Sequence, residues 1–494
     1  MRISLRRTAS VALITALPAL ALVAPLPSAA EPRPGPSGAI PGQYIVTLDP
    51  GTAPIAVLDG LGVKPLFTYR HALSGFAARL TAGQLQRVRA APGVDEVEQD
   101  AVVTIPLGED APADSDLEPP PPVGGPDEPS GPVDFPQETY TPDAPSADPG
   151  PPGEAPPVPE EVAPKKEAEP EQSSPDPAPM AAPPSPWPGT KPVPPVYAPL
   201  PAAPSAPASG AARAKGVRGL GGFTPWGLTR INNRALDGFG YSVRATGAKV
   251  TSYIVDSGIE FSHPDFGGRA VPGYDAIGDG LDGGDCNGHG THVAGTVGGS
   301  YTGVARKTTL VSVRVFPCVG RTANSAVVAG IDWVAGHARK PAVANLSFAG
   351  RWSLATNRAV EGLARAGIFP VAAAGNENVN ACFVSPASSQ SAFTVGAIDQ
   401  EDRRAWFSNW GTCVDIHAPG MGILSAYLNG SFRDLDGTSM AAPHVTGIAA
   451  LYKDTHGDAS FATLSEWLTG HAIRNVPIDG GYGTARLSAF TNGL

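Results

Sequence analysis

From about residue 223 to 494, the sequence predicts an α/β fold with a mostly parallel sheet covered by helices on both faces. Two observations support this. Short runs rich in Val and Ala are typical of buried strands, and stretches with helical periodicity separate them. The expected strands are Val250–Val255, Leu310–Phe316, Val343–Ser347 and Phe369–Ala374, and the expected helices are Asn324–Arg339 and Leu354–Ala366. About 270 residues suit one such domain.

A second compact block is expected at residues 42–106. Gln43–Leu48, Leu73–Leu80 and Val94–Glu98 have the composition of strands. Thr81–Arg89 begins with a residue suited to capping a helix and places apolar side chains on one helical face. About sixty residues of mixed strand and helix predict a small α+β module of marginal stability by itself.

The segment at 107–215 connects the two blocks and differs from both in composition. Residues 111–210 hold 33 of the 55 prolines and carry 16 Asp and Glu against 3 Lys, a charge of −13. The whole chain carries −11, so the rest of the chain nets +2 and offers no basic field for nucleic acid. With almost no apolar periodicity, this segment is predicted to be a disordered, extended acidic linker.

The first 30 residues are predicted to be a signal peptide. Arg2, Arg6 and Arg7 form a positive region, an apolar run from Val11 to Ala24 follows, and Ser28-Ala29-Ala30 offers a cleavage site. The run is shorter than the ~20 residues of a membrane span, and Pro18 interrupts it. The Arg6-Arg7 pair also allows a twin-arginine signal, but the residues after it favour Sec-type export. We expect a secreted, extracellular monomer without a stable membrane anchor.

Four cysteines, Cys286, Cys318, Cys382 and Cys413, lie in the second half of the chain. In an exported protein an even number of cysteines favours disulfides, and four cysteines allow three connectivities. No two of them are spaced as in a zinc cluster.

Three segments of the α/β block place reactive side chains where catalytic groups are expected, at the carboxyl ends of strands. Asp256 follows an expected strand. His289 lies in the Gly-rich sequence Asn287-Gly-His-Gly-Thr-His-Val-Ala-Gly295, and Ser439 lies in Asp436-Gly-Thr-Ser-Met-Ala-Ala-Pro-His-Val-Thr-Gly447. Each residue alone is explained as well by a helix cap or a loop contact. Together they supply a nucleophile, a base and the carboxylate that orients the base, in one of the known chain orders.

These three motifs resemble the subtilisin-like serine protease family (peptidase S8), and most closely its proteinase K and aqualysin branch. The resemblance is nearly continuous from Pro225 to the C-terminus. It implies a seven-stranded, doubly wound parallel sheet and a catalytic triad of Asp256, His289 and Ser439. It further implies that the Asn376 side chain completes an oxyanion hole. It assigns no chemistry to His292 and His444, and we interpret both of them, like the loop residue His263, as structural.

The resemblance also implies how substrate binds. An extended protein or peptide substrate adds as a strand between two enzyme segments. The residues expected to bind it are Gly320, Ser347, Phe348, Ala349 and Gly350, with Ala373, Ala374 and Gly375 lining an apolar S1 pocket. This chain departs from its relatives at Arg321, which replaces a small residue at the rim. We expect Arg321 to alter the S2 and S4 preference that the resemblance implies and to favour acidic substrate residues.

The pairing Cys286–Cys318 and Cys382–Cys413 is implied by the same resemblance. So is one structural calcium site, formed by Asp415 with backbone carbonyls of Gln390 and Ala392; the alternative is that Asp415 is an ordinary loop acid. No cofactor is expected for the chemistry itself.

Residues 42–106 resemble the inhibitor-type propeptide of this family, through Tyr44-Ile-Val46, Gly75–Leu80 and Val94–Asp100. This implies a ferredoxin-like βαββαβ fold that assists folding and acts as an intramolecular inhibitor. Relatives lack the long acidic linker. We therefore expect two cleavages, one at about 106–108 and one between about Ala211 and Phe223.

The sequence as a whole predicts a secreted serine endopeptidase made as an autoprocessed zymogen. Two alternatives remain: a processing protease dedicated to a single substrate, and a catalytically inactive binding protein.

Overall fold

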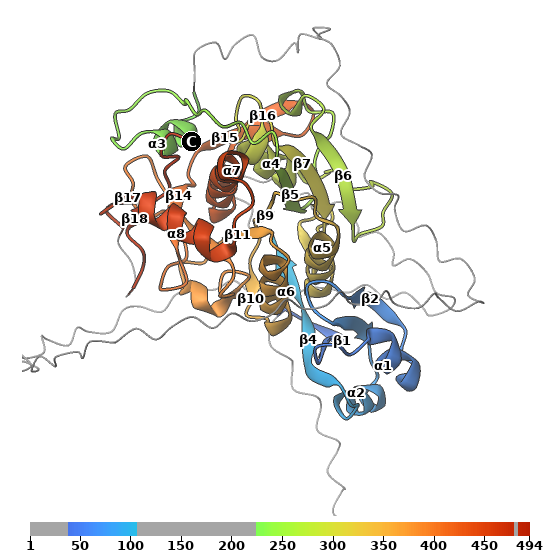
Figure 1. Cartoon of the computed structure of the whole chain (residues 1–494). Helices are drawn as coiled ribbons and strands as arrows, with labels where there is room; N and C mark the ends of the chain where they lie inside the picture. Colours follow the sequence, from blue (N-terminus) through green and yellow to red (C-terminus); the bar gives the residue numbers. More distant parts are fainter. Residues whose placement is uncertain (1–37, 106–223, 479–482) are drawn as a thin grey trace, which may run out of the picture. The chain divides into compact units, whose positions relative to one another are not determined.

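The computed structural model describes residues 38–105, 224–478 and 483–494 (Figure 1). The expected signal peptide at 1–30, the linker at 107–215 and both expected cleavage regions lie outside these ranges. None of the helices in the described ranges is long and apolar enough to cross a membrane.

The N-terminal block has the element order βαββαβ, as the resemblance implies. Its elements are β1 Ala39–Leu48, α1 Pro54–Leu61, β2 Pro65–Tyr69, β3 Gly75–Arg79, α2 Ala82–Arg89 and β4 Val94–Thr104. The strands lie in the order β2-β3-β1-β4, and each neighbouring pair is antiparallel. Helix α2 begins at a capping box, in which the Thr81 hydroxyl accepts the Gln84 N–H and the Gln84 side chain accepts the Thr81 N–H.

The second block is built on a large sheet. Seven strands run parallel to their neighbours in the order β6-β7-β5-β9-β11-β13-β14. These are β5 Thr251–Asp256, β6 Ala270–Asp275, β7 Thr309–Arg314, β9 Ala342–Leu346, β11 Phe369–Ala373, β13 Phe393–Ile398 and β14 Ile416–Pro419. Beyond β14, the two-residue strands β18 Leu487–Ser488 and β17 Ile473–Arg474 extend the sheet to nine strands.

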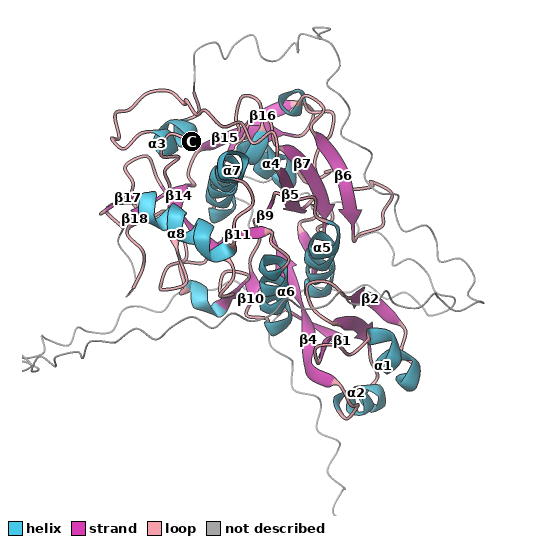
Figure 2. Cartoon of the chain, in the orientation of Figure 1, coloured by secondary structure: helices cyan, strands magenta, loops and turns pink. Residues whose placement is uncertain are grey.

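Helices cover both faces of this sheet (Figure 2). The main ones are α4 His289–Gly298, α5 Asn324–His337, α6 Leu354–Arg365, α7 Thr438–His456 and α8 Phe461–His471, with the short α3 Trp226–Asn232 before the sheet. In strand β9, Val343 packs into the hydrophobic cluster formed with α7, whereas Ala344 and Leu346 pack into the cluster formed with α5 and α6. Because successive strand residues point to opposite faces, both faces of β9 are buried, which explains its continuous apolar run.

Smaller elements complete the second block. The hairpin β15 Ile423–Tyr427 and β16 Ser431–Leu435 packs near α4, and β10 Gly350–Arg351 pairs with β12 Val384–Ser385. Two 3₁₀ turns, η2 and η3, occupy Pro264–Phe266 and Ala381–Phe383.

The three-residue strand β8, Arg321–Ala323, pairs antiparallel with β4 of the N-terminal block. The five-stranded sheet β2-β3-β1-β4-β8 therefore contains strands from both blocks. This shared sheet positions the end of β4 beside the candidate site.

Candidate active site

The three reactive side chains of the motifs come from element ends. Asp256 is the last residue of β5, His289 the first residue of α4, and Ser439 the second residue of α7. All three are at most 1% exposed.

Asp256 and His289 form a direct pair. Oδ1 of Asp256 lies 2.7 Å from Nδ1 of His289 and also accepts the Ser257 N–H at 2.7 Å. A carboxylate only accepts hydrogen bonds, so Nδ1 donates and the second ring nitrogen, Nε2, is left as the acceptor. Nε2 is buried and has no hydrogen-bond partner within the described ranges. The geometry thus provides an oriented imidazole with a free basic nitrogen.

Ser439 forms hydrogen bonds with Ser347, the residue that follows β9. Its hydroxyl donates to the Ser347 carbonyl at 3.1 Å, and the Ser347 hydroxyl donates to the Ser439 carbonyl at 2.8 Å. The hydrogen bond from Ser439 to His289 that a triad would use is therefore not formed in this structure.

Two glycines allow His289 to begin α4 at this place. Gly288 precedes the helix with a φ of +99°, and a Cβ there would lie 2.5 Å from the Tyr427 ring. Gly290 follows His289, and a Cβ on it would lie 2.2 Å from the Gly258 carbonyl oxygen. Larger residues at either position would displace the imidazole from Asp256.

Asp285 organises the turn before His289, and the sequence analysis did not identify it. Its Oδ1 accepts the Ser257 hydroxyl at 2.9 Å and the N–H groups of Asn287 and Gly288, and its Oδ2 accepts the Thr291 N–H and hydroxyl. One carboxylate therefore fixes the end of β5 and the start of α4 relative to each other. The sequence feature that could have identified Asp285 is its place four residues before His289 in a Gly-rich turn.

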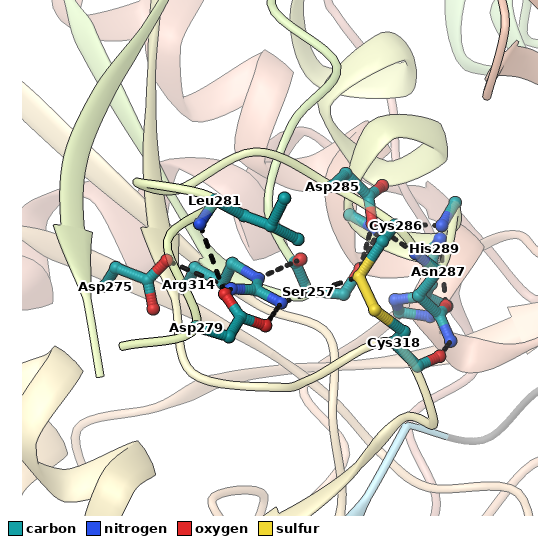
Figure 3. Close-up of a disulfide and its surroundings, with 12 residues drawn as sticks. Ser257, Asp275, Asp279, Leu281, Asp285, Cys286, Asn287, His289, Arg314 and Cys318 are labelled. Carbon is teal, nitrogen blue, oxygen red and sulfur yellow. Dashed lines mark hydrogen bonds and ion pairs between the residues drawn. A yellow bond between two sulfur atoms is a disulfide. The ribbon is translucent and has the colours of Figure 1, made fainter. Parts of the chain in front are cut away.

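The Cys286–Cys318 disulfide lies beside this turn (Figure 3). Arg314 is fully buried next to it and donates to the Ser257 carbonyl, to the carboxylates of Asp275 and Asp279, and to Cys286 Sγ. The second disulfide joins Cys382 and Cys413. Both pairs are those that the family resemblance implies.

Asn376 lies beside the start of α7. Its Oδ1 accepts the N–H and the hydroxyl of Thr438 at 3.0 and 2.7 Å, which leaves its amide N–H groups to donate elsewhere. A Cβ on Gly437 would lie 3.3 Å from Asn376 Nδ2, so this amide faces the start of α7. The N–H groups in the first turn of a helix have no partner within the helix. The Asn376 amide and the Ser439 N–H can therefore serve an oxyanion together.

The end of β4 occupies the expected substrate position. Val103 lies opposite Thr322 and Thr104 opposite Arg321, the Ile105 N–H donates to the Gly320 carbonyl at 3.0 Å, and on its other side Thr104 forms a bridge with Ala349. The tail thus runs as a strand between β8 and residues 349–350. The side chains of Val103 and Ile105 are buried, and that of Thr104 is exposed.

The remaining predicted binding residues are placed as follows. Phe348 is fully buried, with its ring 5.7 Å from that of Phe316. A Cβ on Gly350 would lie 3.2 Å from Val103, so this glycine leaves room for the tail. Ala373 and Ala374 are fully buried in core clusters, and the Gly375 N–H donates to Thr438 Oγ1.

Carboxylates fix the N-terminal block against the second block. Asp100 Oδ1 accepts the Ser325 N–H in the first turn of α5, and Glu98 Oε2 accepts the Ala355 N–H in the first turn of α6. Burial raises the pKa of Glu98 above its ordinary value. In the reverse direction, Asp332 of α5 accepts the N–H groups of Arg70, His71 and Ala72. Sequence reasoning missed these contacts because the partners are more than 200 positions apart.

The other histidines of the motifs make structural contacts. His292 Nε2 bonds the carbonyls of Ile423 and Arg433, and burial lowers its pKa to about 3. His444 Nδ1 bonds the Met440 carbonyl, and burial lowers its pKa to about 4. His263 caps the turn at Asp265 and bonds the Ser431 carbonyl.

Asp415 is a partly buried carboxylate. Its Oδ2 accepts the Thr394 N–H at 2.7 Å, no ion pair to it is formed within the described ranges, and burial raises its pKa to about 6. No cluster of three His, Cys, Asp or Glu suited to a metal occurs in these ranges. A calcium ion here would need backbone oxygens as further ligands, which is the donor set of Asp415 with the Gln390 and Ala392 carbonyls.

The fold and the site together define the class of protein. It is a parallel α/β domain with an Asp–His pair and a serine at the carboxyl ends of its strands. The last strand of a second domain pairs with this domain beside that site. Residues 247–488 match the model of the subtilase family, and residues 61–106 match that of the peptidase inhibitor I9 family.

Known proteins agree with this assignment. A crystal structure of a cold-adapted subtilisin-like serine proteinase superposes with a TM-score of 0.53 at 44% identity, covering 54% of this chain and 98% of that one. The chain is 48% identical to an alkaline serine exoprotease A of Vibrio alginolyticus over 50% of its own length, and 48% identical to an extracellular serine proteinase of a Thermus species over 54%. These matches span 46% and 66% of the two relatives. The chain belongs to the subtilase family and carries an I9-type propeptide domain.

Proposed function

We propose that this chain is a secreted serine endopeptidase made as a zymogen. The observation that carries the proposal is the placement of the β4 tail, which pairs as a strand with β8 and Ala349 and runs toward Ser439. A peptide bound in the same way would present a backbone carbonyl to the serine hydroxyl.

The proposed reaction proceeds through an acyl-enzyme. His289 Nε2 takes the Ser439 hydroxyl proton while Oγ attacks the substrate carbonyl carbon. The Asn376 amide and the Ser439 N–H stabilise the resulting oxyanion. The imidazolium then gives its proton to the leaving amine as the C–N bond breaks. Water, deprotonated by His289, attacks the ester, and the acid and free Ser439 are released.

Asp256 has a supporting role in this scheme. Its hydrogen bond to Nδ1, 2.7 Å long, keeps Nε2 unprotonated at rest and stabilises the imidazolium that forms. The bond from Ser439 to Ser347 has to break before Nε2 can accept the proton, because the hydroxyl has a single hydrogen.

The N-terminal block is proposed to act as an intramolecular inhibitor. Its tail pairs with β8 and so lies where the substrate strand is proposed to bind. Activity would therefore require cleavage behind the tail and release of the block. We propose that processing is autocatalytic and that the mature enzyme is extracellular and monomeric. The names of the relatives support the extracellular part, since one is called an extracellular serine proteinase.

A structural calcium ion held by Asp415 and the carbonyls of Gln390 and Ala392 belongs to the same proposal. When bound, it would compensate the buried carboxylate charge. It would contribute stability and take no part in the chemical step.

Hydrolysis of casein and covalent inhibition together test the function. Wild type should digest casein and lose activity when treated with an organophosphonate, whereas Ser439→Ala should neither digest casein nor take up the label. Ser242→Ala, at an exposed serine outside the site, is the control and should behave as wild type. Digestion by Ser439→Ala at the wild-type rate would refute the proposed mechanism.

The same assay separates the two alternatives. An inactive binding protein would leave casein intact and take up no label. A protease with one dedicated substrate would take up the label at Ser439 and still leave casein intact. The intact motifs and the Asp256–His289 pair favour a working protease over an inactive binding protein.

A further inference from the structure

Arg321 stands directly beside the substrate strand position. In the pairing of β4 with β8, Thr104 lies opposite Arg321. Side chains of directly opposed residues in an antiparallel pair point to the same face, with Cβ atoms about 4.5–5.5 Å apart. Both residues are exposed, whereas the neighbours of Thr104 along the tail, Val103 and Ile105, are buried. Arg321 and Thr104 therefore share the solvent side of the cleft.

The register identifies which substrate residue would meet Arg321. Thr104 also bridges Ala349, and two residues before Ala349 is Ser347, whose carbonyl accepts the Ser439 hydroxyl. In an antiparallel pairing, the substrate residue two positions after the Thr104 position lies opposite Ser347, so its carbonyl is the one next to Ser439. That residue is P1. The Thr104 position is then P3, the third residue before the scissile bond.

The Arg321 guanidinium is available to a ligand. It makes no ion pair or side-chain hydrogen bond with any residue of the described ranges. On the solvent side of β8 its neighbour two residues along is Ala323, and Val102 of the tail lies opposite that alanine. The hydroxyl of Thr104 brings no negative charge to this face.

We propose that Arg321 is a specificity-determining residue that selects an acidic side chain, Asp or Glu, at P3. The inference rests on the proposed endopeptidase function. A P3 carboxylate would lie on the same face as the guanidinium and across one strand spacing from it. A P3 lysine would meet the same positive charge and be disfavoured.

The expected size of the P3 preference follows from the exposure of Arg321 to solvent. An ion pair at an exposed rim contributes little, because solvent and salt screen it, and the expected effect is about threefold in kcat/KM between Glu and Gln. Lysine should be disfavoured relative to Gln by a similar factor. Because salt screens exposed charges, the preference should shrink toward one near 1 M NaCl.

The test uses mature enzyme and three fluorogenic peptides that differ only at P3, which is Glu, Gln or Lys. For each enzyme, the measured quantity is the ratio of kcat/KM between peptides, which does not depend on the fraction of active protein. Wild type should prefer Glu over Lys about tenfold at low salt. Arg321→Gln should bring this ratio close to one, and Arg321→Glu should invert it. Arg244→Gln removes the same charge at an exposed site outside the cleft and should keep the wild-type ratio.

Each result has a defined meaning. Equal rates on all three peptides in wild type, or a Glu preference that persists in Arg321→Gln, would overturn the assignment of Arg321. A Glu preference that is lost equally in Arg244→Gln would also overturn it, since overall charge would then be the cause. If wild type cleaves none of the peptides and no casein, the endopeptidase function itself fails.

Discussion

Asp100 of the propeptide domain accepts the Ser325 N–H at 3.1 Å, where helix α5 begins. The same carboxylate accepts the Gln43 side-chain N–H at 2.7 Å and is fully buried. A carboxylate at a helix N-terminus satisfies a free N–H and interacts favourably with the helix dipole. This contact lies five residues before the end of the described tail, so it fixes the position at which β4 enters the cleft.

Asp100→Ala should therefore loosen the docked propeptide. The substitution leaves the buried Ser325 N–H and Gln43 amide without this partner, a cost of about 1–3 kcal/mol. In the Ser439→Ala precursor, amide hydrogen exchange in β4 should be accelerated. Asp95→Ala is the control: Asp95 pairs with Arg358 at an exposed position, so its loss should change exchange much less. Unchanged exchange in Asp100→Ala would show that the cap does not hold the tail.

Asn376→Asp tests the oxyanion assignment. The variant keeps an oxygen for the Thr438 N–H and hydroxyl but replaces the donor amide by a second oxygen. Loss of an oxyanion donor lowers kcat by about 10²–10³. We expect that loss with little change in KM and in melting temperature, measured on a peptide amide. A KM effect without a kcat effect would place Asn376 in substrate binding instead.

The raised pKa of Asp415 predicts how stability depends on pH without calcium. The carboxyl has a pKa of about 6 in the folded chain, above its ordinary value near 4. Ionisation therefore costs more in the folded state, so this contribution is most favourable below about pH 4 and declines as the pH rises through about 6. The loss is at most about 3 kcal/mol. Excess calcium should restore stability at pH 8 and do little at pH 4.

Asp415→Asn tests the contribution of the carboxylate charge apart from that of the rest of the loop. The neutral amide should make the chelated protein at least as stable as wild type at pH 8 and remove the response to calcium, both read from thermal unfolding in the Ser439→Ala background. Equal stabilisation of wild type and Asp415→Asn by calcium would remove Asp415 from the proposed ligands.

The two disulfides allow a matched comparison. They join residues 32 and 31 positions apart, so the chain-entropy model assigns each about 3–4 kcal/mol. Replacing either pair by serines in the Ser439→Ala background should lower the free energy of unfolding by that amount. The Cys286/Cys318 variant should show the larger loss, because Cys286 also contacts the buried Arg314. Equal or reversed losses would show that the Arg314 contact contributes nothing.

Maturation should involve two cuts. We expect the first at about 106–108, just behind the tail, and the second between about 211 and 223, where the sequence is basic and nearly free of proline. N-terminal sequencing of secreted wild type and Ser439→Ala tests both. Self-cleavage of purified Ser439→Ala near residue 107 would exclude autoprocessing. Fully active wild type starting near 107 would show that the acidic linker stays attached.

Local patterns predicted much of the fold. The Val- and Ala-rich runs became β5, β7, β9 and β11, and the capping residue Thr81 begins α2. The short edge strands β17 and β18 were not predicted, because two residues carry no period. Helix α1 and strand β2 were expected only through the resemblance of this block to a known propeptide.

The site was predictable only where its residues lie in a motif. Asp256 ends a strand, Asn376 follows one, and His289 and Ser439 lie at helix starts, each in a recognisable sequence. Their catalytic roles stay predictions. Asp285, Arg314 and Asp100 were missed because their role depends on partners that only the folded chain brings near. Arg321 was noticed as a departure, but its substrate position required the register of β4 against β8.

The shared sheet has a consequence for the lifetime of the proposed enzyme. Once the propeptide leaves, β8 and residues 349–350 become open strand edges that accept a chain in an extended conformation. Folded neighbours, including other copies of this protein, offer such a stretch only when they open locally. Self-digestion would then be limited more by how often a copy exposes a loop than by the sequence of that loop. The rate at which one mature copy cleaves a given loop of another should therefore rise with the hydrogen-exchange rate of that loop. Cleavage rates that do not correlate with hydrogen exchange would refute the dependence of self-digestion on local opening.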